Sequence, residues 1–293
     1  MTSRSSASGS PPSATTPAGR TPRRTPRPPP KRSPERTAQL GLAIAAPAWL
    51  AVVFLAIPLM ALLTRVDWPN FFTDLTSPIA LAALKLSALT TSITLLIVLA
   101  LGTPLAWMLA RSTGRWVALV RALMTVPLVL PPVVGGVALL AAYGRLGLLG
   151  QPLDLAFGIT IPFSTVAVVV AEVFVALPFY VITVEGSMRS LDSRYDQVAA
   201  TLGASPWRIF TRVAVPMVAP GVAAGAALAW ARALGEFGAT ITFAGNFPGR
   251  TQTVPLGVFT LLEQDPDAAV ALSVLMLLIC VIVLASLRSR WLL

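Results

Sequence analysis

The sequence has 293 residues, of which 55% are hydrophobic and 12% are charged, and its formal net charge is +10. Because soluble globular domains carry roughly 25% charged residues, this composition excludes an ordinary soluble domain and predicts a polytopic membrane protein. Histidine is absent, so the usual metal ligand and the usual general base at neutral pH are missing. The single cysteine, Cys280, lies in an apolar run and excludes a disulfide framework.

Residues 1–37 are rich in Ser, Pro, Thr and Arg and show no apolar periodicity. Such a segment cannot bury enough apolar surface to fold, so we predict a disordered basic tail. Eight basic residues lie before position 38, against the single acid Glu35. We interpret this charge as a signal that keeps the tail in the cytoplasm. Binding of the tail to anionic lipid or nucleic acid is the alternative, and we expect no nucleic-acid partner.

Six apolar blocks follow the tail, each long enough for a bilayer span of about 20 residues. They predict an all-α membrane protein with six transmembrane helices, the first of which occupies residues 38–64. The remaining five belong to a transmembrane domain over residues 84–287. The blocks themselves cover residues 40–64, 84–110, 117–143, 162–184, 213–243 and 268–287.

Arginines predict the orientation of these spans. They cluster after the second, fourth and sixth blocks, whereas the opposite loops are poorer in bases and carry six of the twelve acids. The positive-inside rule then places both termini in the cytoplasm of a multi-pass protein of the cell membrane. The acids of the opposite loops are Asp67, Asp74, Asp154, Glu263, Asp265 and Asp267.

The third block contains the prolines Pro127, Pro131 and Pro132, followed by two glycines. Proline frees backbone carbonyls, which in lipid must be satisfied by protein or by water in a cavity. This pattern predicts a bent helix in the protein interior. Pro131 and Pro132 then line a translocation pathway, or they form a kink that serves packing alone.

The fifth block combines small residues with two charges. Gly221 and Gly225 form a Gly-x-x-x-Gly pair for close helix packing, within the chain or in a dimer. Arg232 and Glu236 are four residues apart and share a helix face. A charge at the middle of a span costs about 2.5–3.5 kcal/mol, so we expect these two to pair or to face water. They belong either to the translocation pathway or to a purely structural pair, and Glu172 of the fourth block is within possible reach.

The longest polar interruption, Glu185–Pro216, reads as two short helices with a sharp break. Gly203 is suited to a left-handed residue that ends the first helix. Ser205 is suited to cap the second helix, with Pro206 at its first position. The first helix carries an apolar stripe of Tyr195, Val198, Ala199 and Leu202. The stretch is either an ordinary amphipathic connector or a docking site for a partner protein.

This stretch resembles the cytoplasmic coupling loop of ABC-importer permeases. The family pattern is roughly Glu-Ala-Ala, three residues, Gly, nine residues and Ile-x-Leu-Pro. It falls here on Gln197–Ala199, Gly203 and Val213–Pro216 with matching spacing. Three departures are visible: Gln197 replaces the acid, with Asp196 one position earlier, a valine replaces the first alanine, and two valines replace Ile and Leu.

The resemblance implies that residues 185–216 fit a groove on a separate ATPase subunit and transmit its motion. If the family acid contacts that partner, Asp196 supplies the contact or the contact is absent. The residues that the resemblance places in coupling are Asp196, Gln197, Ala199, Gly203, Ala204, Ser205, Pro206 and Pro216.

The run ARALGEFGATITFAGNFPGRTQTVPL, residues 231–256, resembles permeases of molybdate importers, which belong to the type I molybdate and sulfate group. The resemblance implies the six-helix type I fold and import of an oxyanion, molybdate, by alternating access. It also implies an extracytoplasmic molybdate-binding protein, two ATPase subunits and a permease homodimer in membrane lipid. Sulfate and tungstate are the alternative cargoes.

The sequence contains no Gly-x-x-x-x-Gly-Lys-Ser/Thr loop, so ATP hydrolysis is expected on a separate subunit. We therefore predict that the chain is not an enzyme and has no catalytic residue, metal or cofactor. An ion-coupled secondary transporter would also carry intramembrane acids such as Glu172 and Glu236. It would need no segment like residues 185–216, and no inverted repeat is evident.

Overall fold

The computed structural model describes residues 34–289, with the side chains of residues 44–283 and 285. The chain divides into two units, residues 1–56 and 57–293, which are described separately. The predicted tail lies outside the described residues except for its last four, which begin α1. Helices α1 to α6 are Pro34–Thr64, Phe71–Leu75, Pro78–Arg111, Arg115–Val129, Pro132–Tyr143 and Gly150–Phe157.

The second half of the chain is helical as well. Helices α7 to α10 are Thr165–Ser190, Arg194–Thr201, Pro206–Ile209 and Val215–Met217, with a π-helical turn, η1, at Phe210–Ala214 between the last two. Helices α11 to α14 are Ala219–Leu234, Gly238–Phe243, Val254–Gln264 and Pro266–Ser289.

Four described helices are long and apolar enough to cross a membrane. They are residues 44–64 of α1, all of α3, all of α7 and residues 266–283 of α14. A fifth candidate is the bent pair formed by residues 206–217 and 219–234, whose parts meet at 78°. The prediction of an all-α membrane protein is confirmed. The described residues contain four single candidate spans and one bent pair, rather than the six spans predicted.

The predicted third span, residues 117–143, is divided at the prolines that predicted a bend. Helix α4 ends at Val129 and α5 begins at Pro132. Leu130 and Pro131 both precede a proline and are extended, with ψ angles of 129° and 134°, because the proline ring disfavours the helical conformation of the residue before it. Two helices of 15 and 12 residues result, about 22 Å and 18 Å long.

The predicted fifth span, residues 213–243, is also divided. At its start the N–H of Val215 bonds the carbonyl of Phe210, five residues earlier. Pro216 has no N–H with which to continue the ordinary α-helical ladder, so the chain widens into η1 and then bends at Val218. Helix α11 stops at Leu234, and α12 is a separate short helix.

Helix α7 is the central helix of the second unit and packs against α3 and α11. Small residues allow the close approach. A side chain at Gly221 would meet Ser187, and one at Gly225 would meet Val184 and Tyr180, all on α7. The glycine pair therefore packs within the chain, which is one of the two roles that the sequence allowed.

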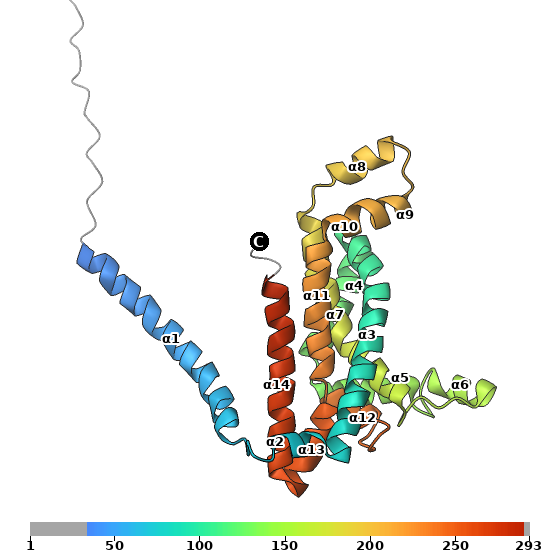
Figure 1. The fold of residues 1–293 in the computed structure, drawn as a ribbon. Helices are drawn as coiled ribbons and strands as arrows, with labels where there is room; N and C mark the ends of the chain where they lie inside the picture. The colour runs from blue at the N-terminus through green and yellow to red at the C-terminus, as the bar shows by residue number, and fades with distance from the viewer. Residues whose placement is uncertain (1–33, 290–293) are drawn as a thin grey trace, which may run out of the picture. The chain divides into compact units, whose positions relative to one another are not determined.

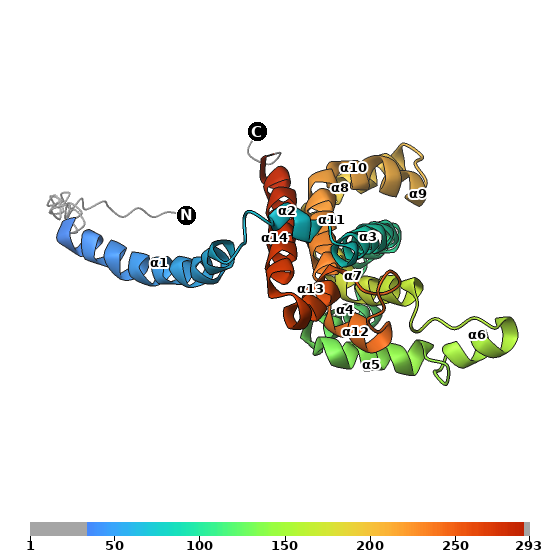
Figure 2. The same ribbon diagram turned by 60° about the horizontal axis from the view of Figure 1, so that its bottom comes forward.

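Functional features lie at two opposite ends of this unit. Helices α8 and α9 lie at one end, called the α8–α9 end, and α6, α12 and α13 lie at the other, called the α6 end (Figure 1). Figure 2 brings the second end forward and shows α6 extending beyond α5. The long helices α3, α7 and α11 connect the two ends.

The packing of α11 on α7 generates a prediction. Gly221→Ala is expected to destabilise the protein by about 1–3 kcal/mol through overpacking, because the added Cβ would lie 2.5 Å from the Cβ of Ser187. Thermal unfolding of the purified protein in detergent measures the effect. Gly186→Ala on α7 is the matched control, since nothing lies within 4 Å of its Cβ position.

The paired variant Gly221→Ala with Ser187→Gly removes the clash and is expected to recover most of the lost stability. Equal melting temperatures for Gly221→Ala and Gly186→Ala would contradict the packing described here.

Candidate functional site

The two short helices of residues 185–216 meet at the predicted break. Gly203 has a φ of +81°, in the left-handed region that a residue without Cβ adopts at least cost. Its N–H bonds the carbonyl of Ala200 at 3.0 Å. The Ser205 side chain accepts a hydrogen bond from the Arg208 N–H at 3.4 Å and caps α9, with Pro206 at its first position. The local predictions for Gly203, Ser205 and Pro206 are confirmed. Residues 185–190, however, belong to the end of α7.

The apolar stripe of α8 is not covered by its own chain. Tyr195, Val198 and Leu202 are 51%, 58% and 82% exposed, and Trp207 of α9 is 69% exposed. Ala199 is half-buried. Contiguous exposed apolar residues of this kind mark interaction surfaces. The other residues that the resemblance placed here are Gln197, Ser205, Pro206 and Pro216, which are exposed, and Ala204, which is half-buried.

Phe210 attaches the exposed segment of α8 and α9 to α3. It is buried, and its ring centroid lies 5.4 Å from that of Trp107 in α3 and 5.5 Å from that of Trp207. Aromatic contacts at such separations add about 0.5–1.5 kcal/mol beyond their buried area. One face of the segment is thus exposed while the opposite face is attached to α3.

Asp196 has its partner within the chain. Its carboxylate lies 2.7 Å from Nε of Arg111, the last residue of α3, in an ion pair rather than a well-directed hydrogen bond. Both side chains are 19% exposed. A guanidinium nitrogen of Arg111 also donates to the carbonyl of Leu191, just after α7, at 3.3 Å. Arg111 therefore connects the ends of α3 and α7 to α8.

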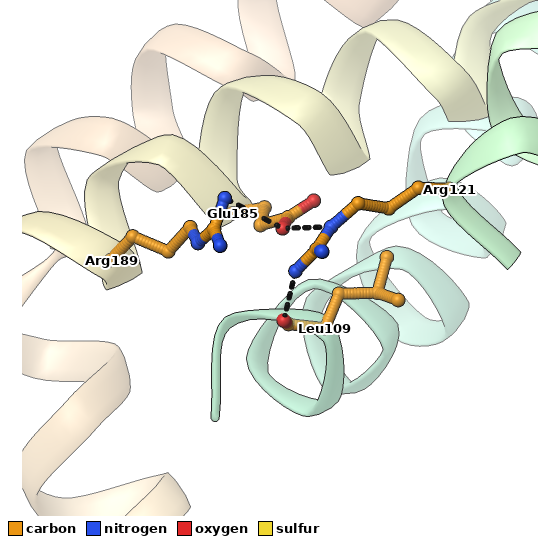
Figure 3. A network of polar contacts seen from close by, with 4 residues as sticks. All are labelled: Leu109, Arg121, Glu185 and Arg189. Atoms are coloured by element: carbon orange, nitrogen blue, oxygen red, sulfur yellow. Dashed lines mark hydrogen bonds and ion pairs between the residues drawn. The ribbon is translucent and has the colours of Figure 1, made fainter. Parts of the chain in front are cut away.

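A second arginine forms a parallel connection through Glu185 (Figure 3). Nε of Arg121 in α4 donates to the Glu185 carboxylate at 2.7 Å, and another of its nitrogens donates to the Leu109 carbonyl at 2.7 Å. Arg189, one turn along α7, lies 3.8 Å from the same carboxylate. Arg121 thus holds α4 against α7 and the end of α3. Sequence reasoning used Arg111 and Arg121 only for orientation, because a pairing between distant segments leaves no periodic signal.

Arg232 and Glu236 form an ion pair, one of the two arrangements that the sequence allowed. They do not share a helix face as expected, because α11 ends at Leu234 and Glu236 lies beyond it. One guanidinium nitrogen lies 2.7 Å from Oε2 of Glu236, whose side chain is 1% exposed. The other carboxylate oxygen of Glu236 accepts a hydrogen bond from the Ala239 N–H at 2.8 Å, in the first turn of α12. The pair therefore also holds α12 at the end of α11.

Arg232 shares a cavity of about 110 Å³ with Pro132, Gly135 and Phe174. The structure thus brings together Arg232 and Pro132, two of the residues that the sequence assigned to a pathway. Pro131 is the residue just before α5 and does not line this cavity. The break between α4 and α5 is what places Pro132 beside α7 and α11.

Glu172 is not a partner of Arg232. Its two carboxylate oxygens accept hydrogen bonds from Thr90 at 2.8 Å and Thr94 at 2.7 Å, both on α3. All three residues are buried. The two threonines, four residues apart on one helix face, were missed by sequence reasoning, although a polar pair within an apolar span is a visible signal. They make Glu172 a link between α3 and α7.

Comparisons with known proteins agree with this architecture. Residues 102–290 match the family model described as binding-protein-dependent transport system inner membrane component. The chain is 50% identical over 244 residues to the molybdenum transport system permease protein ModB of Mycobacterium tuberculosis, covering 83% of this chain and 92% of the relative. It is 39% identical over 210 residues to ModB of Escherichia coli, covering 72% and 92% of the two chains.

Among solved structures, a chain of a bacterial alginate ABC transporter in complex with its periplasmic protein matches with a TM-score of 0.69. The sequence identity is 15%, over 86% of this chain and 93% of the other. At that identity the likeness concerns the fold alone. The family match covers more than half of the chain, and the chain therefore belongs to the family of binding-protein-dependent transport system inner membrane components.

Proposed function

We propose that this protein is the permease subunit of an ATP-driven molybdate importer. It moves the anion across the cell membrane by alternating access. The observation that carries the proposal is the 50% identity to a molybdenum permease across 83% of the chain. The exposed apolar surface on α8 and α9 supports it, because a permease without a nucleotide-binding loop needs an energy-supplying partner.

The α8–α9 end is then the cytoplasmic end, and both termini lie in the cytoplasm. The charges support this orientation, because Arg111 pairs with Asp196 of α8, and Arg121 and Arg189 contact Glu185 near the end of α7 that leads to α8. The α6 end is then the outer end, where a molybdate-binding protein delivers the anion.

The partner at the cytoplasmic end is an ABC ATPase subunit, and the surface of residues 194–207 fits a groove on it. A short helix with an exposed apolar face is a common way to fill such a groove. Since the chain presents one such surface and two ATPases act together, two permease copies form a homodimer in membrane lipid and bind two ATPase subunits.

Motion of the ATPase reaches the spans through the two arginine connections. Arg111 links α8 to the ends of α3 and α7, and Arg121 links α4 to the same ends. Helices α4 and α7 contribute residues to the cavity that holds Arg232. A displacement of α8 and α9 therefore shifts the positions of α4 and α7, which line that cavity.

The pairing of Arg232 with Glu236 suits passage rather than retention of an anion. A free arginine inside the membrane would attract a divalent anion strongly, and conduction requires that binding be weak enough for release. Glu236 neutralises much of that attraction at a distance of 2.7 Å. Arg232 then provides hydrogen-bond donors near the pathway, while the Arg232–Glu236 pair carries no net charge.

The first test is ATPase activity of the complete complex in lipid, with the binding protein loaded with molybdate, tungstate or sulfate in turn. Molybdate is expected to give the largest stimulation. Gly203→Asp is expected to abolish it, because a side chain at φ +81° costs about 1–2 kcal/mol and adds a charge to the docking surface. Gly158→Asp, at φ +65° and equally open, is the control at the other end.

Stimulation by sulfate alone would keep the transporter class and overturn the cargo. Failure of the chain to associate with any ATPase would overturn the class itself.

The Arg111–Asp196 pair predicts non-additive coupling. Arg111→Gln and Asp196→Asn are each expected to lower molybdate-stimulated ATPase activity about fivefold, equivalent to about 1 kcal/mol. The double variant is expected to lose no more than Arg111→Gln alone, because the ion pair is removed in all three variants and only Arg111 also donates to the Leu191 carbonyl. Arg115→Gln is the control, since Arg115 is exposed, lies outside residues 194–207 and forms no salt bridge in the described residues. Additive losses would show that the two residues act independently.

The intramembrane pair predicts a change in both kinetic constants. Glu236→Gln keeps an acceptor for the Ala239 N–H but leaves Arg232 without its counter-charge. Turnover and KM for molybdate uptake are both expected to fall roughly tenfold, because a tenfold tighter ground state corresponds to about 1.4 kcal/mol. The control is Glu172→Gln, which is expected to leave KM unchanged. Glu172 is also a buried acid but, unlike Glu236, has no ion pair in the described residues. Unchanged constants in Glu236→Gln would contradict a pathway role.

A further inference from the structure

A cavity of about 460 Å³ lies at the α6 end of the second unit. Three segments that are far apart in the sequence line it: the end of α5, the linker before α7 and the loop between α12 and α13. Two of the lining residues are arginines, Arg145 and Arg250, and both are exposed. Thr160 adds a hydroxyl group to the lining.

The backbone at Arg250 is held in place by hydrogen bonds of both its N–H and its carbonyl group. The Arg250 N–H bonds the carbonyl of Phe247 at 3.1 Å, and the Arg250 carbonyl accepts a hydrogen bond from the Thr165 hydroxyl at 2.9 Å. The Thr251 hydroxyl accepts one from the Phe247 N–H at 2.9 Å. The loop is therefore a defined structure, and it directs the arginine to the cavity from a fixed position.

Arg145 is positioned by a tight turn after α5. The Gly144 N–H bonds the Leu140 carbonyl at 2.8 Å, and the Gly147 N–H bonds the Gly144 carbonyl at 2.8 Å. A Cβ at Gly147 or Gly150 would collide with the backbone of this turn. Only glycine fits there, so the turn brings Arg145 to the same cavity as Arg250.

The charges at this end are segregated. In the part of the chain that the structure describes, neither Arg145 nor Arg250 forms a salt bridge. Four acids of this end lie near one another, since burial together with Asp265, Asp67 and Asp267 raises the pKa of the Asp74 carboxyl. Asp154 lies on α6, which packs against the turn that carries Arg145. The cavity is thus a local positive region at an end whose other charges are mainly acidic.

We propose that this cavity binds a tetrahedral, doubly charged oxyanion at the outer face before the anion enters the translocation pathway. The inference rests on the proposed function, which makes the α6 end the outer end and an oxyanion the cargo. Arginine donates paired, charge-assisted hydrogen bonds to the oxygens of such anions. Because Arg145 and Arg250 line the same cavity, a small anion there is attracted by both guanidinium groups. It also relieves the repulsion between the two like charges.

Binding at this site is weak and suited to transfer. Both arginines are hydrated, and a volume of about 460 Å³ is an order of magnitude larger than the ~30 Å³ that one water occupies. The anion therefore keeps part of its hydration shell. Local concentration of the anion, rather than tight retention, is the expected effect, since charged clefts focus the field on ligands of opposite charge.

Carboxylates of a docked binding protein would suit the same two guanidinium groups, so the test must separate the two sources. The purified transporter complex is exposed to tungstate without the binding protein, and anomalous scattering locates the bound ion. Binding strength is measured by titration with tungstate and with sulfate. The dissociation constant of the complex with its binding protein is measured on the same samples.

The wild type is expected to show tungstate between Arg145 and Arg250. The double variant Arg145→Gln with Arg250→Gln is expected to lose that ion, to bind anions at least tenfold more weakly there, and to dock the binding protein unchanged. Replacing both arginines by lysine keeps the charge but not the paired hydrogen bonds, so this variant is expected to bind more weakly than the wild type and more tightly than the glutamine variant, which controls for folding. Arg65→Gln, an exposed arginine that does not line the cavity, is the matched control.

The site assignment is overturned if the wild type holds no ion in the cavity, or if the glutamine variant weakens docking while anion binding persists. In the second case the arginines recognise the binding protein. These outcomes differ from failure of the proposed function, which would appear as absent molybdate uptake by the wild type whatever occupies the cavity.

Discussion

The ion pair between Arg121 and Glu185, with its companion between Arg111 and Asp196, is the interaction on which the proposed action of this protein depends. Both pairs have a separation of 2.7 Å. Together they join the ends of α3, α4 and α7 to α8. Since removal of one partner leaves a partly buried charge uncompensated, the loss of either partner would disturb the connection between the surface segment and the spans.

The close packing of α7 makes these connections effective. Glycines on α11 and Gly102 on α3 allow both helices to approach α7 near Tyr180, whose hydroxyl lies 2.7 Å from that of Thr103. Glu172 adds hydrogen bonds from α7 to Thr90 and Thr94. Closely packed helices move as units because interiors have few voids and low compressibility, so a displacement at one end is transmitted along α7.

Charge is placed differently at the two ends and in the middle. At the α8–α9 end, arginines are paired with acids and bind helices together. In the middle, Arg232 is neutralised by Glu236. At the α6 end, Arg145 and Arg250 have no acidic partner in the described residues. This sequence of environments suits an anion that is attracted at one end, passes a neutralised guanidinium and leaves past paired charges.

The sequence alone determined what depends on neighbouring residues: the all-α membrane class, the left-handed turn at Gly203, the cap at Ser205 and the bend at Pro131 and Pro132. Tertiary structure decided what depends on distant segments. It joined Asp196 to Arg111 and Glu172 to α3. For Arg232 and Glu236 the sequence left pairing or contact with water open, and the structure shows a pair. Contacts between distant segments carry no periodicity, which is why the sequence did not reveal them.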